Sequence, residues 1–204
     1  AASGAQVVLS GAEGVAYDWP DGRASLNGTL TIGGGGLPEA AIQLAQAQPG
    51  GAVTGTAIVR PYAAGGARLA LTPVRFTRAR DGSTRFDTQA TLSGPLADGR
   101  VDGLVMPLSG RWDGGAAVAV NPDCTTVAWQ RLAVSSLVLN PARLRLCPTG
   151  RALVAVNRAG LGGGARLGAT RLAGRLGGTP VTLAMRGGRL DLARLDFALD
   201  GVES

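Results

Sequence analysis

Turn-forming sequences recur along the whole chain, about every 8 to 16 residues. Asp81-Gly82-Ser83, Asp98-Gly99 and Asp113-Gly114-Gly115 are typical of these signals. The others lie at 19–22, 33–36, 49–51, 65–66, 121–123, 140–141, 148–150, 162–164, 177–178, 187–188 and 200–201. Such spacing leaves little room for helices of ordinary length, so it favours many short strands.

Side chains between the turns alternate in polarity. In residues 84–92, Phe86 and Leu92 fall on one face of an extended chain, and Arg85 and Gln89 fall on the other. This period of two is typical of a half-buried antiparallel strand. Similar alternation runs through 26–32, 67–71, 181–185 and 191–199. The sequence therefore predicts an all-β fold with at most one or two short helices.

Two stretches allow an alternative to strands. Residues 37–48 are rich in Ala and Gln and lie between prolines, which permits a helix of about three turns. The alternation of Ile42 and Leu44 with their neighbours favours a strand instead. Residues 160–188 have weak periodicity and could include a short helix, and the glycine-rich 160–164 is a candidate hinge.

An Arg-Leu dipeptide occurs nine times. The arginines are at positions 68, 131, 143, 145, 166, 171, 175, 189 and 194. In a strand each pair places an aliphatic group on one face and a guanidinium on the other. One interpretation is a sheet with a basic exterior; the other is an apolar trough whose rim arginines contact phosphate groups.

The charged residues limit the possible chemistry. The chain has 20 basic residues and 14 acids, but no His, and every basic residue is Arg. Ser-His-Asp and Cys-His catalysis, Walker A loops and Schiff bases are therefore excluded. We predict a non-enzymatic protein with no cofactor and no metal site. We also expect no nucleic-acid partner, because the arginines are spread evenly and aromatic residues are few.

Cys124 and Cys147 are the only cysteines. An even pair without other metal ligands predicts one disulfide and an oxidising compartment, and two buried free thiols are the alternative. A simple hairpin turning near 140–143 would pair Cys147 with Ser136 instead. The chain before Ser136 must therefore double back, or the bond must cross between two walls of the fold.

Apolar runs such as 104–108 are far shorter than the roughly 18 to 20 residues that span a bilayer. The chain begins with Ala1 and without a recognisable signal peptide, so we expect a processed product or an excised segment.

Two blocks of sequence resemble a known family. The first runs from 37 to 76 and contains the sequence from Tyr62-Ala-Ala-Gly-Gly to Thr-Pro-Val-Arg-Phe76. The second contains Pro95-Leu-Ala-Asp-Gly, Gly110-Arg-Trp112 and the Leu-Cys147-Pro148 ending. Both are similar to the YdbH family, which belongs with the TamB and AsmA-like proteins of the Gram-negative cell envelope.

The resemblance implies a curved antiparallel sheet that forms a taco-like groove or partial barrel. It also implies a role in phospholipid transport between the inner and outer membranes, with acyl chains in the groove. Residues 1–204 would then be a single segment of a larger periplasmic protein that an N-terminal segment outside this chain tethers to the inner membrane. Its partners would be acyl chains, the remaining segments of the same chain, and an envelope lipoprotein or outer-membrane protein.

Eleven apolar residues on alternating faces are the predicted groove lining. They are Leu69, Leu71, Phe76, Phe86, Leu92, Leu104, Met106, Leu137, Leu139, Leu144 and Leu146. A non-catalytic β-domain whose apolar face is filled by its own side chains, and which docks to envelope partners, is the first alternative. A carbohydrate-binding domain is the second, although Trp19, Trp112 and Trp129 form no evident aromatic platform in the sequence.

Overall fold

The computed structural model describes residues 4, 6–11, 14–18, 23–35, 37–48, 50–96, 98–191 and 196–201. Every regular element in this part of the chain is a β-strand, which confirms the all-β prediction. The predicted turn at 19–22, including Trp19, and residues 192–195 within the predicted strand 191–199 lie outside the described residues.

The strands are numbered in chain order. The first eleven are β1 (Gln6–Ser10), β2 (Val15–Asp18), β3 (Arg23–Leu26), β4 (Gly28–Gly34), β5 (Leu37–Gln46), β6 (Val53–Val59), β7 (Tyr62–Ala64), β8 (Ala67–Leu71), β9 (Val74–Arg78), β10 (Thr84–Leu96) and β11 (Gly99–Trp112). The remaining strands are β12 (Val118–Val120), β13 (Thr125–Trp129), β14 (Arg131–Val134), β15 (Leu137–Leu139), β16 (Ala142–Pro148), β17 (Val154–Asn157), β18 (Gly160–Leu167), β19 (Thr170–Leu176), β20 (Thr179–Met185), β21 (Gly187–Asp191) and β22 (Asp196–Asp200).

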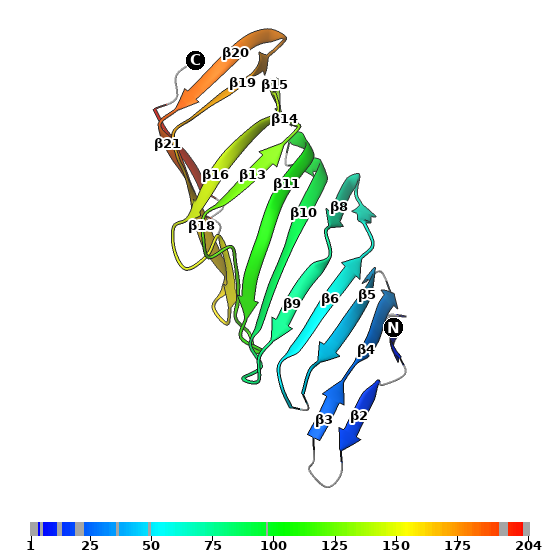
Figure 1. The fold of residues 1–204 in the computed structure, drawn as a ribbon. Helices are drawn as coiled ribbons and strands as arrows, with labels where there is room; N and C mark the ends of the chain where they lie inside the picture. The colour runs from blue at the N-terminus through cyan, green and yellow to red at the C-terminus, as the bar shows by residue number, and fades with distance from the viewer. Residues whose placement is uncertain are drawn as a thin grey trace.

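Most strands belong to one large antiparallel sheet, while β2 and β3 form a hairpin of their own (Figure 1). Several short strands are consecutive pieces of longer extended segments. Strands β12, β13 and β14 all pair with β11 at successive positions along it. Strands β15, β16 and β17 then return along β14, β13 and β12. The same arrangement continues through β18–β19 and β20–β21, so the chain is an up-and-down meander of long, interrupted segments.

Prolines mark several of the interruptions. Pro61 separates β6 from β7, Pro73 separates β8 from β9, and Pro141 separates β15 from β16. Proline has no N–H to donate to a ladder, so each one ends a run of pairing without reversing the chain. The turn signals at 121–123, 140–141 and 148–150 are therefore breaks within extended segments and do not reverse the chain.

Asn121 bridges the break between β12 and β13. Its backbone has a φ of 51°, a conformation that Asn tolerates better than most residues. Its side-chain oxygen accepts a hydrogen bond from the N–H of Ser109 (2.8 Å), and its Nδ2 donates to the carbonyl of Pro107 (3.0 Å). The buried amide thus replaces the ladder bonds that the interrupted strand no longer supplies to β11.

The two ambiguous stretches are both strands. Residues 37–46 form β5, which pairs with β4 and β6, as the alternation of Ile42 and Leu44 predicts. A short helix between 160 and 188 is wrong, because β18, β19 and β20 occupy this stretch. Residues 160–164 form the first part of β18. Gly163 has a φ of 119°, and a Cβ there would overlap the carbonyl group of Leu153 on the neighbouring chain segment, so this glycine lets two segments approach closely.

Candidate functional site

The register of the sheet aligns apolar residues from different strands on one face. Phe86 in β10 lies opposite Phe76 in β9, and Leu92 lies opposite both Leu69 in β8 and Leu104 in β11. Directly paired residues project to the same side of a sheet. We call the side that carries these residues the apolar face, and the opposite side the outer face.

All eleven predicted lining residues lie on the apolar face, but they differ in burial. Leu139 is buried, with 7% of its surface exposed. Leu92, Leu104, Leu137 and Leu144 pack against the core that contains Leu139. Leu71, Phe76, Phe86, Met106 and Leu146 are half-buried. Leu69 is the most open of the set, at 38% exposed.

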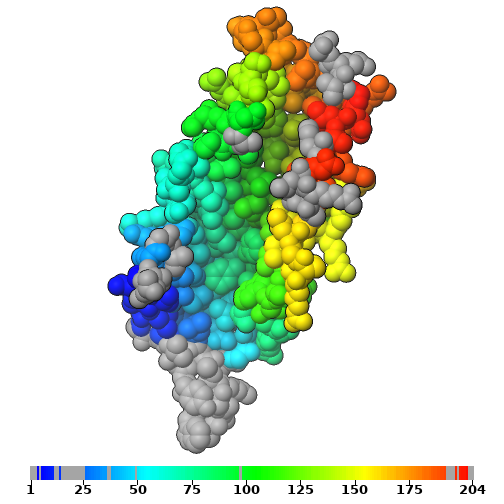
Figure 2. All heavy atoms as spheres, turned by 180° about the vertical axis from the view of Figure 1, so that it is seen from behind, coloured from blue at the N-terminus to red at the C-terminus, as the bar shows by residue number. Residues whose placement is uncertain are grey.

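The sheet curls toward its apolar face. Val101 in β11 and Met185 in β20 belong to one buried cluster with Trp129, Leu139 and Leu172. Strands β14, β15 and β19 lie between β11 and β20 in the sheet, so this cluster can form only where the sheet bends around it. Figure 2 shows the resulting hollow, which the early strands border on one side and β17, β18 and β22 on the other. The apolar face is thus the concave face.

Curvature divides this concave face into two regions. Around β11 to β20 the buried cluster occupies part of the hollow with the protein's own side chains, and Trp129 is only 5% exposed. In the described parts of β1 to β10, by contrast, the buried apolar side chains are two alanines, Ala57 and Ala90. On the same face Val7 is 64% exposed. We call the first region the packed end and the second the open end.

The sequence prediction of the lining misses several members of the same face. Val101, Trp129, Leu172 and Met185 form the centre of the packed end, yet none is in the predicted set. The Arg-Leu repeat could have identified Leu172, because its pattern places each leucine on the face of the other leucines.

In the described strands, the arginine and the leucine of each Arg-Leu dipeptide lie on opposite faces of the sheet, as the alternation predicts. In each pair that the structure places in a strand, the leucine lies on the apolar face and the arginine on the outer face. These pairs begin at Arg68, Arg131, Arg143, Arg145, Arg166, Arg171, Arg175 and Arg189. The pair at 194–195 is outside the described residues. These arginines therefore lie on the outer face and make a basic exterior.

The turn at 113–117 joins β11 to β12. Asp113 Oδ1 accepts hydrogen bonds from the N–H groups of Gly115 (2.8 Å) and Ala117 (3.1 Å), which hold the pKa of Asp113 below its usual range. Trp112 donates its indole N–H to the carbonyl of Gly115 (2.8 Å), and the guanidinium of Arg78 lies 5.7 Å from the ring centroid. Trp112 therefore stabilises the 113–117 turn through its indole N–H, and its ring binds the guanidinium of Arg78 by a cation–π contact.

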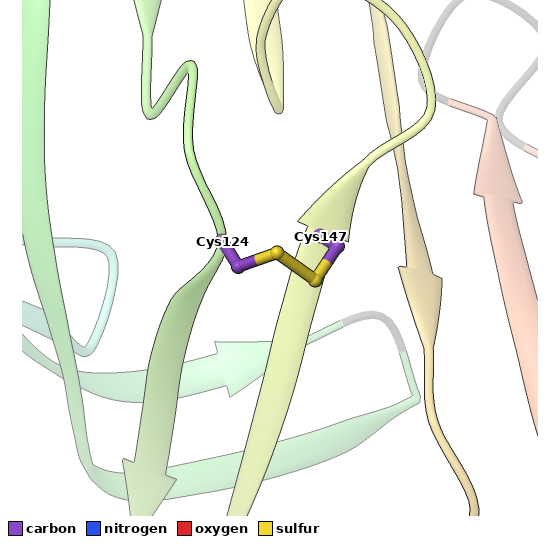
Figure 3. Close-up of a disulfide and its surroundings, with 2 residues drawn as sticks. All are labelled: Cys124 and Cys147. Carbon is purple, nitrogen blue, oxygen red and sulfur yellow. A yellow bond between two sulfur atoms is a disulfide. The ribbon is translucent and has the colours of Figure 1, made fainter.

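Cys124 and Cys147 form a disulfide, with 4.0 Å between their Cα atoms, as predicted (Figure 3). Strand β13 pairs with β16, while residues 130–141 leave to form the β14–β15 hairpin and then return. The chain thus doubles back, the first of the two routes that the spacing allowed. Thr125 and Leu146 pair on the apolar face, so the neighbouring disulfide lies on the outer face, away from the groove.

The chain matches no family model, no curated protein and no solved structure. Among the residues that the structure describes, no group of three or more His, Cys, Asp or Glu side chains could hold a metal ion. No helix in that same part of the chain has the length and apolar character to cross a membrane.

Proposed function

We propose that this chain is a segment of a periplasmic protein that carries phospholipids between the inner and outer membranes. The acyl chains would lie along the open end of the apolar face while the headgroups stay in water. One observation carries the proposal: residues from many strands share a continuous apolar concave face that the protein's own side chains leave uncovered at one end.

The chemistry of this surface suits a sliding chain. Shielding hydrocarbon from water contributes about 0.8 kcal/mol for each CH₂ group, without fixing its position along the groove. The surface is also smooth, because Phe86 lies over Gly110 and Phe76 lies over Gly55 on the adjacent strand. The two rings therefore cover the sheet floor at these points.

The disulfide agrees with an oxidising compartment such as the periplasm. Together with the YdbH-like blocks of sequence, it supports an envelope location. Under this proposal the partners of the described strands are the acyl chains and the other segments of a longer conduit, and no catalytic group is required.

Site-specific photo-crosslinking tests the proposal. A crosslinking residue is placed at Leu69, Leu71 or Phe76 on the apolar face, and at Arg85 or Gln89 on the outer face as a control. After exposure to phospholipid vesicles, we expect at least fivefold more lipid adduct at the apolar positions. Equal labelling of the two faces would overturn the proposal.

The packed end favours a second candidate, a non-catalytic docking domain whose concave face is filled by its own side chains. Native mass spectrometry of the protein purified from membranes separates the two functions. Co-purified phospholipid supports the conduit, whereas a protein that carries no lipid, together with no adduct at Leu69, supports the docking domain.

A further inference from the structure

The outer face carries an unbalanced group of arginines near the disulfide. Arg166 in β18 pairs directly with Arg189 in β21, and Arg143 and Arg145 lie on β16, the strand on the other side of β18. All four side chains are exposed. We call Arg143, Arg145, Arg166 and Arg189 the arginine patch.

Like charges directly opposite each other on a sheet are destabilising, and nearby acids normally offset them. No acidic residue occurs in β13, β16 or β18. None of the four arginines forms an ion pair with another residue in the described part of the chain. The acids that the pairing places near the patch are Asp191, two residues after Arg189 in β21, and Asp196 and Asp200, which flank the residue opposite Arg189 in β22.

Another arginine pair on the outer face provides a comparison. Arg85 lies opposite Arg111 in the pairing of β10 with β11. Here acids are interspersed, because Arg111 is 4.0 Å from Asp81 and the neighbouring Arg75 is 4.0 Å from Asp87. Among the described residues, an ion pair therefore forms at Arg111 of the first pair, whereas neither Arg166 nor Arg189 forms one.

We infer that the arginine patch binds the phosphate groups of an anionic lipid surface. Guanidinium groups bind phosphate oxygens in bidentate fashion, and the patch presents several on a sheet whose strands are roughly 4.8 Å apart. The disulfide, which joins β13 to β16 at the patch, holds this part of the face together. The outer face would then rest on the membrane while the apolar face remains available to lipid tails.

Lipid suits this patch better than nucleic acid. Binding of single-stranded nucleic acid relies on aromatic side chains that stack with bases. Trp129 is the one aromatic residue between positions 113 and 191, and it is buried on the apolar face. The choice of lipid also rests on the proposed transport function.

Vesicle flotation tests the inference. The probes are vesicles of phosphatidylcholine with and without phosphatidylglycerol, at low and high salt. The double variant Arg145→Gln/Arg166→Gln is compared with Arg85→Gln/Arg111→Gln, which also removes two charges and an arginine pair from the outer face. We expect at least tenfold weaker binding to the anionic vesicles for the first variant and less than twofold for the second, with binding of the wild type lost at high salt.

Removing charge from the patch relieves repulsion, so the thermal midpoint of the first variant should be no lower than that of the wild type. Equal losses for the two variants, no binding of the wild type to anionic vesicles, or tighter binding to RNA than to those vesicles would each overturn the inference. Lipid adducts at Leu69 report on the groove separately, so their loss would count against the transport function and not against the patch.

Discussion

At the scale of single residues, Gly110 shapes the concave floor because it has no side chain. A Cβ at Gly110 would lie 2.5 Å from Phe86 Cζ and 2.6 Å from the carbonyl oxygen of Ala119. The absence of a side chain therefore lets the Phe86 ring lie across β11 and lets β12 approach. This glycine is required by close contact and not by an unusual backbone conformation.

We predict that Gly110→Ala lowers the free energy of unfolding by about 1–3 kcal/mol, because Phe86 and the adjacent strand must move. Gly162→Ala is the matched control in another strand, since nothing lies within 4 Å of the position that its Cβ would take. The control should change stability by less than about 1 kcal/mol. Urea denaturation measures both, and equal effects would contradict the role assigned to Gly110.

At the scale of strands, the disulfide fixes a pairing that the chain reaches only after a detour. Strands β13 and β16 are joined through the β14–β15 hairpin, which pairs with β11 on one side and β19 on the other. The bond between Cys124 and Cys147 spans a sequence separation of 23 and closes this detour at its base. It lies next to the break at 121–124, where the pairing of β12 with β11 is interrupted.

Replacing both cysteines by serine should lower the free energy of unfolding by about 3 kcal/mol, the loop-closure entropy of a loop of this length. Urea denaturation of Cys124→Ser/Cys147→Ser measures the loss. The wild type in reductant should unfold at the same urea concentration as the variant, and a variant as stable as the oxidised wild type would contradict the prediction. Since the disulfide lies on the outer face, lipid adducts at Leu69 should not change.

At the scale of the whole molecule, the apolar face of one curved sheet differs in burial along its length. The packed end buries Leu172 at 5% exposure within a cluster of five buried side chains, so it supplies a core without a second layer. The open end leaves Leu69 uncovered on the same face. The burial of large apolar side chains on this face is therefore concentrated in the cluster at the packed end.

The difference in burial between Leu172 and Leu69 predicts different costs for the same substitution. Leu172→Ala should lower the free energy of unfolding by about 2–5 kcal/mol, because it leaves a cavity in the packed end. Leu69→Ala should cost less than about 1 kcal/mol, because its side chain is 38% exposed and lies outside the buried cluster. Thermal and urea denaturation check both, and a large loss for Leu69→Ala would show that the open end is covered in solution.

Much of the candidate site was predictable from local alternation. The eleven predicted lining residues share one face because side-chain direction in a strand has a period of two. A single stretch such as Phe86 to Leu92 already shows this period. The same rule separates Arg from Leu in each dipeptide. The burial of Leu139 and the exposure of Leu69 were not predictable, because both depend on segments distant in sequence.

The sequence alone determined that this chain forms strands, which residues share a side, and that its two cysteines are candidates to pair. Tertiary structure decided that Pro141 interrupts a segment without reversing it, that β13 meets β16 after a detour, and that the sheet curls until Val101 and Met185 share a core. The physical reason is the distance along the chain over which each kind of interaction acts. Alternation and turn chemistry act between neighbouring residues, whereas register and curvature arise from hydrogen bonds and packing between strands far apart in the chain.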